Sequence, residues 1–198
     1  GILHLDLKPG NVLIDERGAP QVGDFGLAHR ISEAAEGRVM AAGTPAYMAP
    51  EQAGRNARLS IRTDVWGLGA ILFEMLTGEP PFVGHNSAET LRRLLNQPLD
   101  PPRMRDPSVP SDLDAICRHC LAKNPAERYA SARELADDLQ RYIDGRPVSV
   151  RRPGWPERVA LWARREPRAA LLTGGLACTL FAGLALSVTL WRQAENHR

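Results

Sequence analysis

The chain has 198 residues, a formal net charge of +2 and a hydrophobic content of 43%. This length fits one modest domain with additional segments, and the hydrophobic content is sufficient for a packed core. A net charge so close to zero argues against nucleic acid as a general partner. The 3 cysteines form no even disulfide framework, which indicates a reducing compartment for the globular part.

The chain opens with a polar loop, HLDLKPGN at residues 4–11, whose residue types suit phosphoryl transfer. Asp6 is a candidate base, because a carboxylate at hydrogen-bond distance from a hydroxyl orients it and accepts its proton. Lys8 is a cation that could meet the moving phosphate. Asn11 and Asp24 offer an amide oxygen and a carboxylate oxygen, which are ligands that Mg²⁺ prefers.

A hairpin is expected directly after this loop. Residues 12–15 and 21–23 have the pattern of two short strands, and residues 16–20 have the composition of a turn. Such a hairpin would fix the loop before it against the loop after it, so that Asn11 and Asp24 can reach the same ion.

Residues 27–51 show no clear period and are expected to form an extended loop, and loops of this length inside a compact domain are usually functional. The proline-rich residues 98–110 are expected to form a surface loop. Periodicity and end signals predict helices at residues 63–77, 87–97, 111–123 and 131–144.

The end signals of these helices are specific. The helix at 63–77 is apolar nearly all round, which predicts burial, and Gly78 is expected to end it. Ser87 is the expected N-cap of the second helix. Ser111 and Ser131 begin the last two helices, and each is followed three residues later by an acid, which resembles a capping box.

Cys117 and Cys120 form a C-x-x-C pattern with His119 between them. A metal site is one interpretation, but no second ligand pair accompanies them. The favoured interpretation is a helix whose i and i+3 positions face the core.

Three motifs together identify a family. The loop at 4–11, DFG at 24–26 and APE at 49–51 come in the order, and at about the spacing, of the protein kinase catalytic loop, magnesium loop and activation-segment end. The chain resembles, over about residues 1–145, the C-terminal lobe of a bacterial, membrane-bound, eukaryotic-like serine/threonine protein kinase. The family usually has arginine where this chain has Leu5.

The resemblance implies an α+β fold, mainly α: a protein-kinase-like C-lobe. It also implies ATP and Mg²⁺ as cofactors and protein Ser/Thr hydroxyls as acceptors. The sequence starts at the catalytic loop and contains no glycine-rich phosphate loop, so the N-lobe is expected to be absent. We therefore expect a fragment of a longer kinase that is inactive alone.

The resemblance also assigns roles to single residues. Asp6 would be the catalytic base, Lys8 would meet the transferring phosphate, and Asn11 and Asp24 would bind nucleotide-bound magnesium. Thr44 would tie Asp6 to Lys8, which also indicates serine or threonine substrates. The alternatives are a turn-forming aspartate at position 6 and a solvated surface lysine at position 8.

Other residues would support this site. His4 is expected to pack against Phe25 rather than to act as a base, and Gly26 allows a backbone angle that a side chain would forbid. The remaining support comes from three charged residues: Glu51 would pair with the buried Arg128, and Asp64 would accept backbone N–H groups of the catalytic loop. For Asp64 a helix-start acid is a compatible alternative.

Leu5 carries regulatory information, because the arginine usual at this position binds a phosphate on the activation segment and leucine cannot. Between Asp24 and Glu51 the only hydroxyl side chains are Ser32, Thr44 and Tyr47. Since the last two are expected to be structural, activity is expected to depend little on phosphorylation of this segment.

The C-terminal part has the composition of a membrane anchor. Residues 146–168 are rich in arginine and proline and are expected to form a basic juxtamembrane linker. Residues 169–191 carry no charge, and at about 1.5 Å per residue a helix of this length spans a bilayer core of about 30 Å. Residues 192–198 would be a short extracytoplasmic tail. A buried soluble helix is the alternative for 169–191.

Charge sets the expected orientation. The arginines precede the span, so the positive-inside rule places the kinase lobe in the cytoplasm of a single-pass protein of the bacterial inner membrane. Gly183 and Ser187 form a small-xxx-small pair that could support a homodimer, although incidental small residues explain them equally well.

Three classes of protein compete for this sequence: a membrane-anchored kinase, a pseudokinase that only binds, and a membrane-anchored scaffold. Asp6, Lys8, Asn11 and Asp24 are all present, which argues against a degenerate site. The sequence upstream of Gly1 would discriminate best, because a glycine-rich loop and a nucleotide-binding lysine belong there in a kinase.

Overall fold

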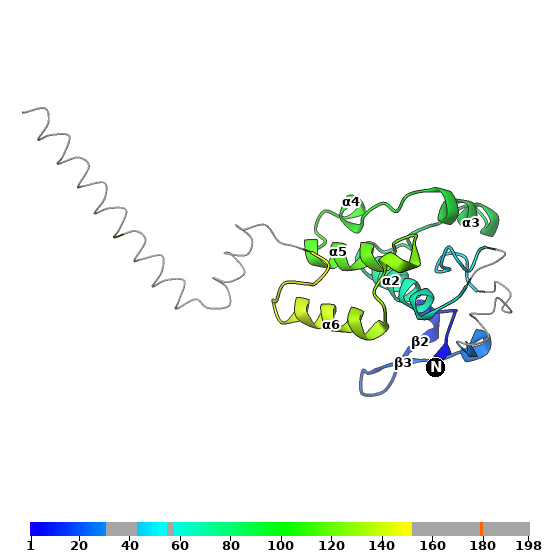
Figure 1. Cartoon of the computed structure of the whole chain (residues 1–198), viewed down its shortest axis with the longest axis horizontal. Coiled ribbons are helices and arrows are strands. Elements are labelled where there is room, and N and C mark those ends of the chain that lie inside the picture. The colour runs from blue at the N-terminus through cyan, green and yellow to red at the C-terminus, as the bar shows by residue number, and fades with distance from the viewer. Residues whose placement is uncertain (31–42, 55–57, 152–178, 180–198) are drawn as a thin grey trace, which may run out of the picture. The chain divides into compact units, whose positions relative to one another are not determined.

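The computed structural model describes residues 1–30, 43–54, 58–151 and 179, and the remaining residues are not described (Figure 1). Residues Gly1–Arg151 form one compact unit. Its α-helices are α2 (Ile61–Thr77), α3 (Ser87–Asn96), the short α4 (Pro102–Arg105), α5 (Ser111–Cys120) and α6 (Ala132–Ile143). The described part is therefore mainly helical, as predicted.

The helix α2 organises this unit. The Ser60 side chain accepts a hydrogen bond from the Arg62 N–H and forms a capping box with Thr63, so the helix begins two residues before the predicted start. Gly78 ends the helix as predicted, with a φ of 81° that favours glycine. The helix contacts α4, α5 and α6 (Figure 1).

The predicted burial of α2 is confirmed for one side of the helix, but the prediction is wrong for another side. Trp66 and Phe73 are fully buried, and they form a core with Met48, Phe82 and Leu94. Met75, however, is 78% exposed. It lies in an apolar groove of about 460 Å³ between α2, α5 and α6.

Three predictions about the helices need correction. The N-cap of α3 is Asn86, whose side chain accepts from the Glu89 N–H, and not Ser87. The segment 98–110 contains the short helix α4, which begins at Pro102 because proline suits the first helical position. The helix α5 ends at Cys120 instead of residue 123.

The two predicted capping boxes had different outcomes. Ser131 is confirmed as the N-cap of α6, since its hydroxyl accepts from the Glu134 N–H at 3.2 Å. The box at Ser111 is wrong, because Pro110 occupies the cap position without a side-chain bond. The Asp114 carboxylate accepts instead from the Arg103 N–H at 3.0 Å, which joins α5 to α4.

Cys117 and Cys120 are both free and buried, which confirms the core-facing interpretation. Cys120 packs in a second core with Val65, Ile116 and Tyr129. In the part of the chain that the structure describes, no three His, Cys, Asp or Glu side chains come together as a metal site.

The strands are short and lie beside the catalytic-loop sequence. The strands β2 (Val12–Ile14) and β3 (Pro20–Val22) form the predicted antiparallel hairpin, with Val12 opposite Val22. The strands β1 (Ile2–Leu3) and β4 (His29–Arg30) form a second antiparallel pair. Residues 27–30 are thus partly a strand and not only loop as predicted.

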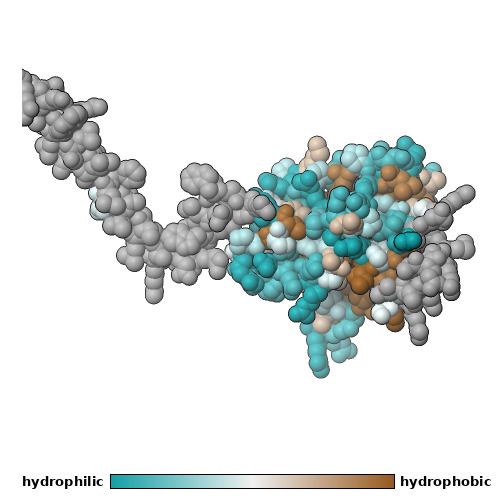
Figure 2. Space-filling view, in the orientation of Figure 1, coloured by the Kyte–Doolittle hydropathy of each residue, from teal (hydrophilic) through white to brown (hydrophobic). Residues whose placement is uncertain are grey.

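The surface in Figure 2 is mainly hydrophilic, with hydrophobic residues gathered in separate small groups. Within the described ranges no helix is long and apolar enough to cross a membrane. The predicted span at 169–191 lies outside these ranges except for Thr179, as do the linker from residue 152 onward and the tail at 192–198.

Candidate active site

The first turn of α2 holds the catalytic-loop sequence in place. The Asp64 carboxylate accepts hydrogen bonds from the backbone N–H groups of His4 and Leu5, both at 2.9 Å. Burial raises the pKa of Asp64, and these two N–H donors offset part of that rise. A Cβ atom at position 67 would lie only 2.8 Å from the Leu7 Cβ. The loop can therefore pack closely on α2 only because residue 67 is glycine.

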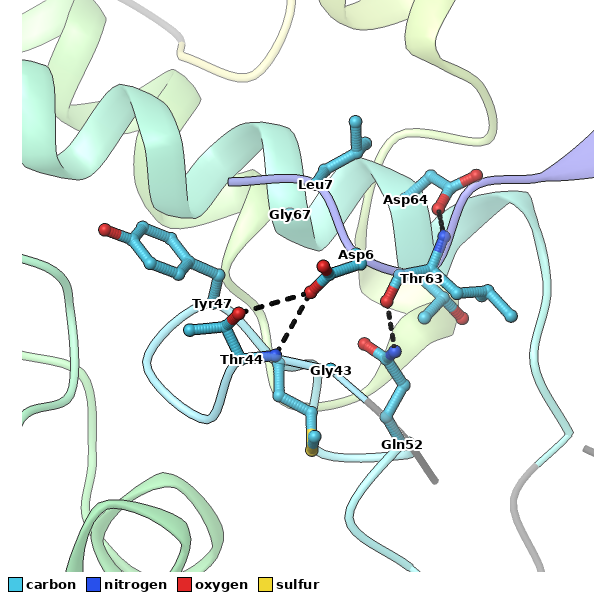
Figure 3. Close-up of a pocket in the computed structure, with 11 residues that line it drawn as sticks. Asp6, Leu7, Gly43, Thr44, Tyr47, Gln52, Thr63, Asp64 and Gly67 are labelled. Carbon is cyan, nitrogen blue, oxygen red and sulfur yellow. Dashed lines mark hydrogen bonds between the residues drawn. The ribbon is translucent and has the colours of Figure 1, made fainter. Parts of the chain in front are cut away.

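The Asp6 carboxylate is the centre of a hydrogen-bond cluster. Its Oδ2 accepts from Lys8 Nζ at 2.6 Å and from Asn11 Nδ2 at 3.2 Å. Its Oδ1 accepts from the Thr44 N–H at 3.1 Å and from the Thr44 hydroxyl at 3.4 Å (Figure 3). Two side chains of the same loop and one residue 38 positions away therefore converge on one carboxylate.

These contacts determine the charge of Asp6. Burial raises its pKa, but the Lys8 ammonium and the bonds from Thr44 and Asn11 outweigh burial, so the pKa of Asp6 lies below its ordinary value of 3.8. Asp6 is consequently ionised at neutral pH.

Thr44 connects the two charged residues of the loop. Lys8 Nζ donates to the Thr44 hydroxyl at 3.0 Å as well as to Asp6. The preceding Gly43 has a φ of 141°, and a Cβ atom there would lie 3.4 Å from Asp6 Oδ1. A side chain at position 43 would therefore both strain the backbone and crowd the carboxylate.

The hairpin between Asn11 and Asp24 brings the residue before Asp24 into contact with the Asn11 backbone. The Gly23 N–H donates to the Asn11 backbone oxygen at 2.8 Å, which places Asp24 next in the chain after that contact. Asn11 Nδ2 donates to the Asp6 backbone oxygen at 2.8 Å and to its carboxylate. These two bonds fix the orientation of the Asn11 side-chain amide. Within the residues that the structure describes, Asn11 Oδ1 accepts no hydrogen bond.

His4 and Phe25 are in contact as expected, with ring centroids 4.8 Å apart. His4 Nδ1 accepts from the Asp6 N–H at 3.3 Å, and its Nε2 lies 2.9 Å from the Gly23 oxygen. Both ring nitrogens are thus used, which leaves His4 a positioning role. Asp24 has a φ of 57°, and its carboxylate accepts from the Gly26 N–H at 3.3 Å.

Glu51 and Arg128 form the expected pair, with Nη1–Oε1 at 2.7 Å and Nη2–Oε2 at 2.8 Å. The Arg128 side chain is completely buried. The remaining guanidinium donors bond backbone oxygens of Ala122, Arg62 and Lys123.

Comparison with known proteins agrees with this geometry. The model of the family described as "Protein kinase domain" matches residues 1–139. The chain belongs to the protein kinase domain family. The cluster around Asp6, the DFG aspartate and the Glu51–Arg128 pair all lie within the matched residues.

The relatives are bacterial kinases. This kinase-domain chain is 41% identical over 149 residues to the serine/threonine-protein kinase PknB of Mycobacterium leprae, covering 74% of this chain and 24% of that protein. It is 40% identical over 150 residues to PknB of Mycobacterium tuberculosis, with the same coverage. It is 37% identical over 148 residues to the probable PknB of Bifidobacterium longum, covering 73% and 21%. The chain spans about a quarter of the length of these curated relatives.

The donor set of this kinase domain fits magnesium. Asn11 Oδ1 is a neutral oxygen with its orientation fixed, and Asp24 is an exposed carboxylate with Oδ2 outside any described hydrogen bond. Two oxygens suit Mg²⁺, which usually keeps water molecules and substrate phosphates as its other ligands.

Sequence patterns missed Gln52, which is 4% exposed. Its Nε2 donates to the Leu5 backbone oxygen at 2.7 Å (Figure 3). Its Oε1 accepts from the Ala49 N–H at 2.9 Å. Gln52 thus ties the APE motif to the catalytic loop. No local signal indicates the bond to the catalytic-loop sequence, because Leu5 lies 47 residues away.

Leu5 itself has an unexpected conformation. Its φ is 66°, in the left-handed region where a leucine side chain is unfavourable. Asp64 binds its N–H, Gln52 binds its oxygen, and the side chain is buried. The surrounding contacts therefore maintain a strained backbone directly before Asp6.

Proposed function

We propose that the chain is the C-terminal lobe of a serine/threonine protein kinase, which transfers the γ-phosphate of ATP to Ser and Thr hydroxyls of proteins. The observation that carries this proposal is the ionised Asp6 carboxylate, held by Lys8, Asn11 and Thr44. Such a cluster has a cation and a proton acceptor side by side, which is what phosphoryl transfer to an alcohol requires.

Asp6 would act on the acceptor hydroxyl. Its depressed pKa keeps it unprotonated, so it can accept a hydrogen bond from the substrate O–H and orient the oxygen toward the phosphorus. The oxygen–phosphorus bond forms while the bond to the ADP oxygen breaks, and Asp6 receives the proton late in this exchange.

Lys8 would stabilise the charge on the group in transfer. Its ammonium lies 2.6 Å from Asp6 Oδ2, so a hydroxyl held by Asp6 is also close to this cation. Thr44 keeps Lys8 and Asp6 in this arrangement through its hydroxyl. Asn11 and Asp24 would hold magnesium, which when bound neutralises nucleotide phosphate charge.

The direct test uses the intact protein with ATP, magnesium and a generic protein acceptor. We expect phosphoserine and phosphothreonine in the product, and loss of transfer when EDTA is added. Asp24→Asn should lower the rate at least 100-fold, about 2.7 kcal/mol of barrier. Asp15→Asn is the control, because Asp15 only caps the hairpin turn. Absence of both transfer and magnesium-dependent ATP binding would overturn the proposal.

The proposal extends to the site of action. Residues 169–191 would anchor the protein in the bacterial inner membrane, with the lobe in the cytoplasm. The basic linker predicted at 146–168 would begin after residue 151, because residues up to 151 belong to the compact unit of the lobe. The absence of charge in the span and the arginines before it support this orientation. An alkaline phosphatase fused after Arg198 should be active outside the cytoplasm. If the fusion after Arg198 is inactive and a fusion before residue 169 is active, the orientation is the opposite of the one proposed.

Two further parts of the proposal concern assembly. Residues 1–198 alone are expected to transfer no phosphate, because the sequence holds no glycine-rich phosphate loop. Peptide phosphorylation by the purified chain would contradict this.

Gly183 and Ser187 support a homodimer of the span, and Gly183→Ile should weaken cross-linking between copies.

A further inference from the structure

The segment after α6 is part of the folded lobe. Val148 is 3% exposed and packs in the second core, beside Val65, Ile116 and Tyr129. The family match ends at residue 139, and sequence patterns put the end of the lobe at residue 145. The contacts of residues 148–151 with α5 and α6 show that the folded lobe continues past both of these ends.

The fastening point is Asp138, which is 2% exposed on α6. Its Oδ1 accepts from the Ser149 N–H at 2.8 Å, and its Oδ2 accepts from the Ser149 hydroxyl at 2.7 Å. The Tyr129 hydroxyl donates to the same Oδ2 at 2.8 Å. Burial raises the pKa of Asp138, but these bonds outweigh it and lower the pKa overall, so the carboxylate is charged at neutral pH.

A second contact lies two residues further on. Arg151 Nη1 donates to the Ser111 hydroxyl and to Asp112 Oδ1, both at 2.7 Å. We call the set Asp138, Ser149, Arg151 and Asp112 the exit clasp, because it holds the chain against the first turn of α5 and the middle of α6 just before residue 152.

We propose that Ser149 is a phosphorylation site and that a phosphoryl group there opens the exit clasp. Ser149 is an exposed residue whose hydroxyl donates to the buried Asp138, so a modifying enzyme reaches the oxygen when this hydrogen bond opens. Nothing in the kinase chemistry proposed above uses Ser149. The inference goes beyond that function, because any serine kinase could supply the group.

The chemistry of the modification explains the opening. The Ser149 oxygen forms a bond to the γ-phosphorus of a nucleoside triphosphate, the bond to the nucleoside diphosphate breaks, and the hydroxyl proton leaves to a base. The hydroxyl donor to Asp138 is thereby lost. A group of about −1.5 to −2 charge then replaces a donor that was 2.7 Å from a carboxylate.

Asp138 cannot move away from this charge, since it is buried on a helix and bonded to Tyr129. Ser149 must move instead. Arg146, which is half-exposed beside Asp144, is a cation outside the clasp that can receive the phosphate, whereas Arg141 lies 3.7 Å from Asp138 Oδ1 at the clasp itself. Residues 148–151 would therefore detach from α6, and the phosphate would also compete with Asp112 for Arg151.

The test installs phosphoserine genetically at position 149 of the full chain, so that its outcome does not depend on kinase activity. Hydrogen exchange of the backbone amides of residues 149–151 measures how often the exit clasp opens. We expect at least tenfold faster exchange with phosphoserine. Ser149→Ala should give a smaller increase, because it keeps the N–H bond to Asp138.

The matched control is phosphoserine at Ser108, an exposed serine whose N–H also bonds an aspartate, Asp106. Because Asp106 is the C-cap of α4 and contacts no residue of the exit clasp in any described hydrogen bond, this control should leave exchange at residues 149–151 unchanged. If exchange at residues 149–151 after phosphorylation of Ser149 stays within twofold of that in the unmodified protein, the claim that phosphorylation opens the exit clasp is contradicted. Mass spectrometry of the protein from its own cells should find phosphate on Ser149, and its absence under all growth conditions would overturn the site.

Discussion

Arg128 and Glu51 lie 77 residues apart in sequence and meet in a two-pronged ion pair, with the guanidinium fully buried beneath the ring of Trp66 at 4.9 Å. The pair joins the APE motif to the segment that precedes α6. Gln52, the residue after Glu51, donates to the Leu5 backbone oxygen, so the segment that carries the pair also holds the loop that contains Asp6.

Glu51→Ala should strongly destabilise the lobe. Loss of the carboxylate leaves the Arg128 charge buried and unpaired, which typically costs about 3–5 kcal/mol. Urea unfolding of the two proteins measures the difference. The control is Asp144→Ala, which removes the partner of Arg146 in an exposed pair and should change the free energy of unfolding little. Equal effects of the two substitutions would contradict the role of the buried pair.

Thr44→Val should reduce turnover while the fold persists. The variant keeps the backbone N–H that bonds Asp6 but loses the hydroxyl that bonds Lys8. We expect kcat to fall about tenfold or more, about 1.4 kcal/mol, with little change in KM for ATP. Thr77→Val, which alters a hydroxyl at the far end of α2, is the control. Unchanged kcat in Thr44→Val would show that this link is dispensable.

Ser32→Ala in the intact protein should leave kcat nearly unchanged. Ser32 lies outside the described residues, and the prediction depends on Leu5, whose side chain is buried and cannot bind a phosphate. A tenfold loss, about 1.4 kcal/mol, would contradict it. Initial rates on a protein substrate, with ATP saturating, decide the question.

The titration of Asp6 should depend on Lys8. In the folded protein its pKa lies below 3.8, so the ionised form contributes stability above that pH and the contribution is lost as the pH falls through the lower folded value. Lys8→Met removes the cation and should move the midpoint upward. Carbon-13 NMR of the Asp6 carboxyl group measures both midpoints. A wild-type midpoint at or above 3.8, or no change in Lys8→Met, would contradict the cluster.

Local signals in the sequence located most of the fold. Ser131 and Gly78 were found as helix ends because a cap acts on residues within one turn. Local patterns failed where two polar residues compete, as at Asn86 and Ser87. They also failed at Ser111, whose hydroxyl bonds a residue 40 positions away.

The site was predictable for a different reason. The spacing of the motifs and the family resemblance located Asp6, Lys8, Asn11 and Asp24, but not the contacts that hold them. The left-handed backbone of Leu5 and its bond from Gln52 arise only when distant segments meet. Asp138 was equally hidden, because an aspartate on a polar helix face gives no sign of burial under Ser149.

Phosphate transfer by Asp6→Asn in the intact protein tests the central claim most directly. Asparagine keeps the size of the side chain, so ATP binding and the unfolding midpoint should stay close to those of the wild type. We predict that labelled phosphate transfer to a protein acceptor falls at least 100-fold, about 2.7 kcal/mol of barrier. Transfer at a rate within threefold of wild type would show that the Asp6 cluster does not carry the chemistry.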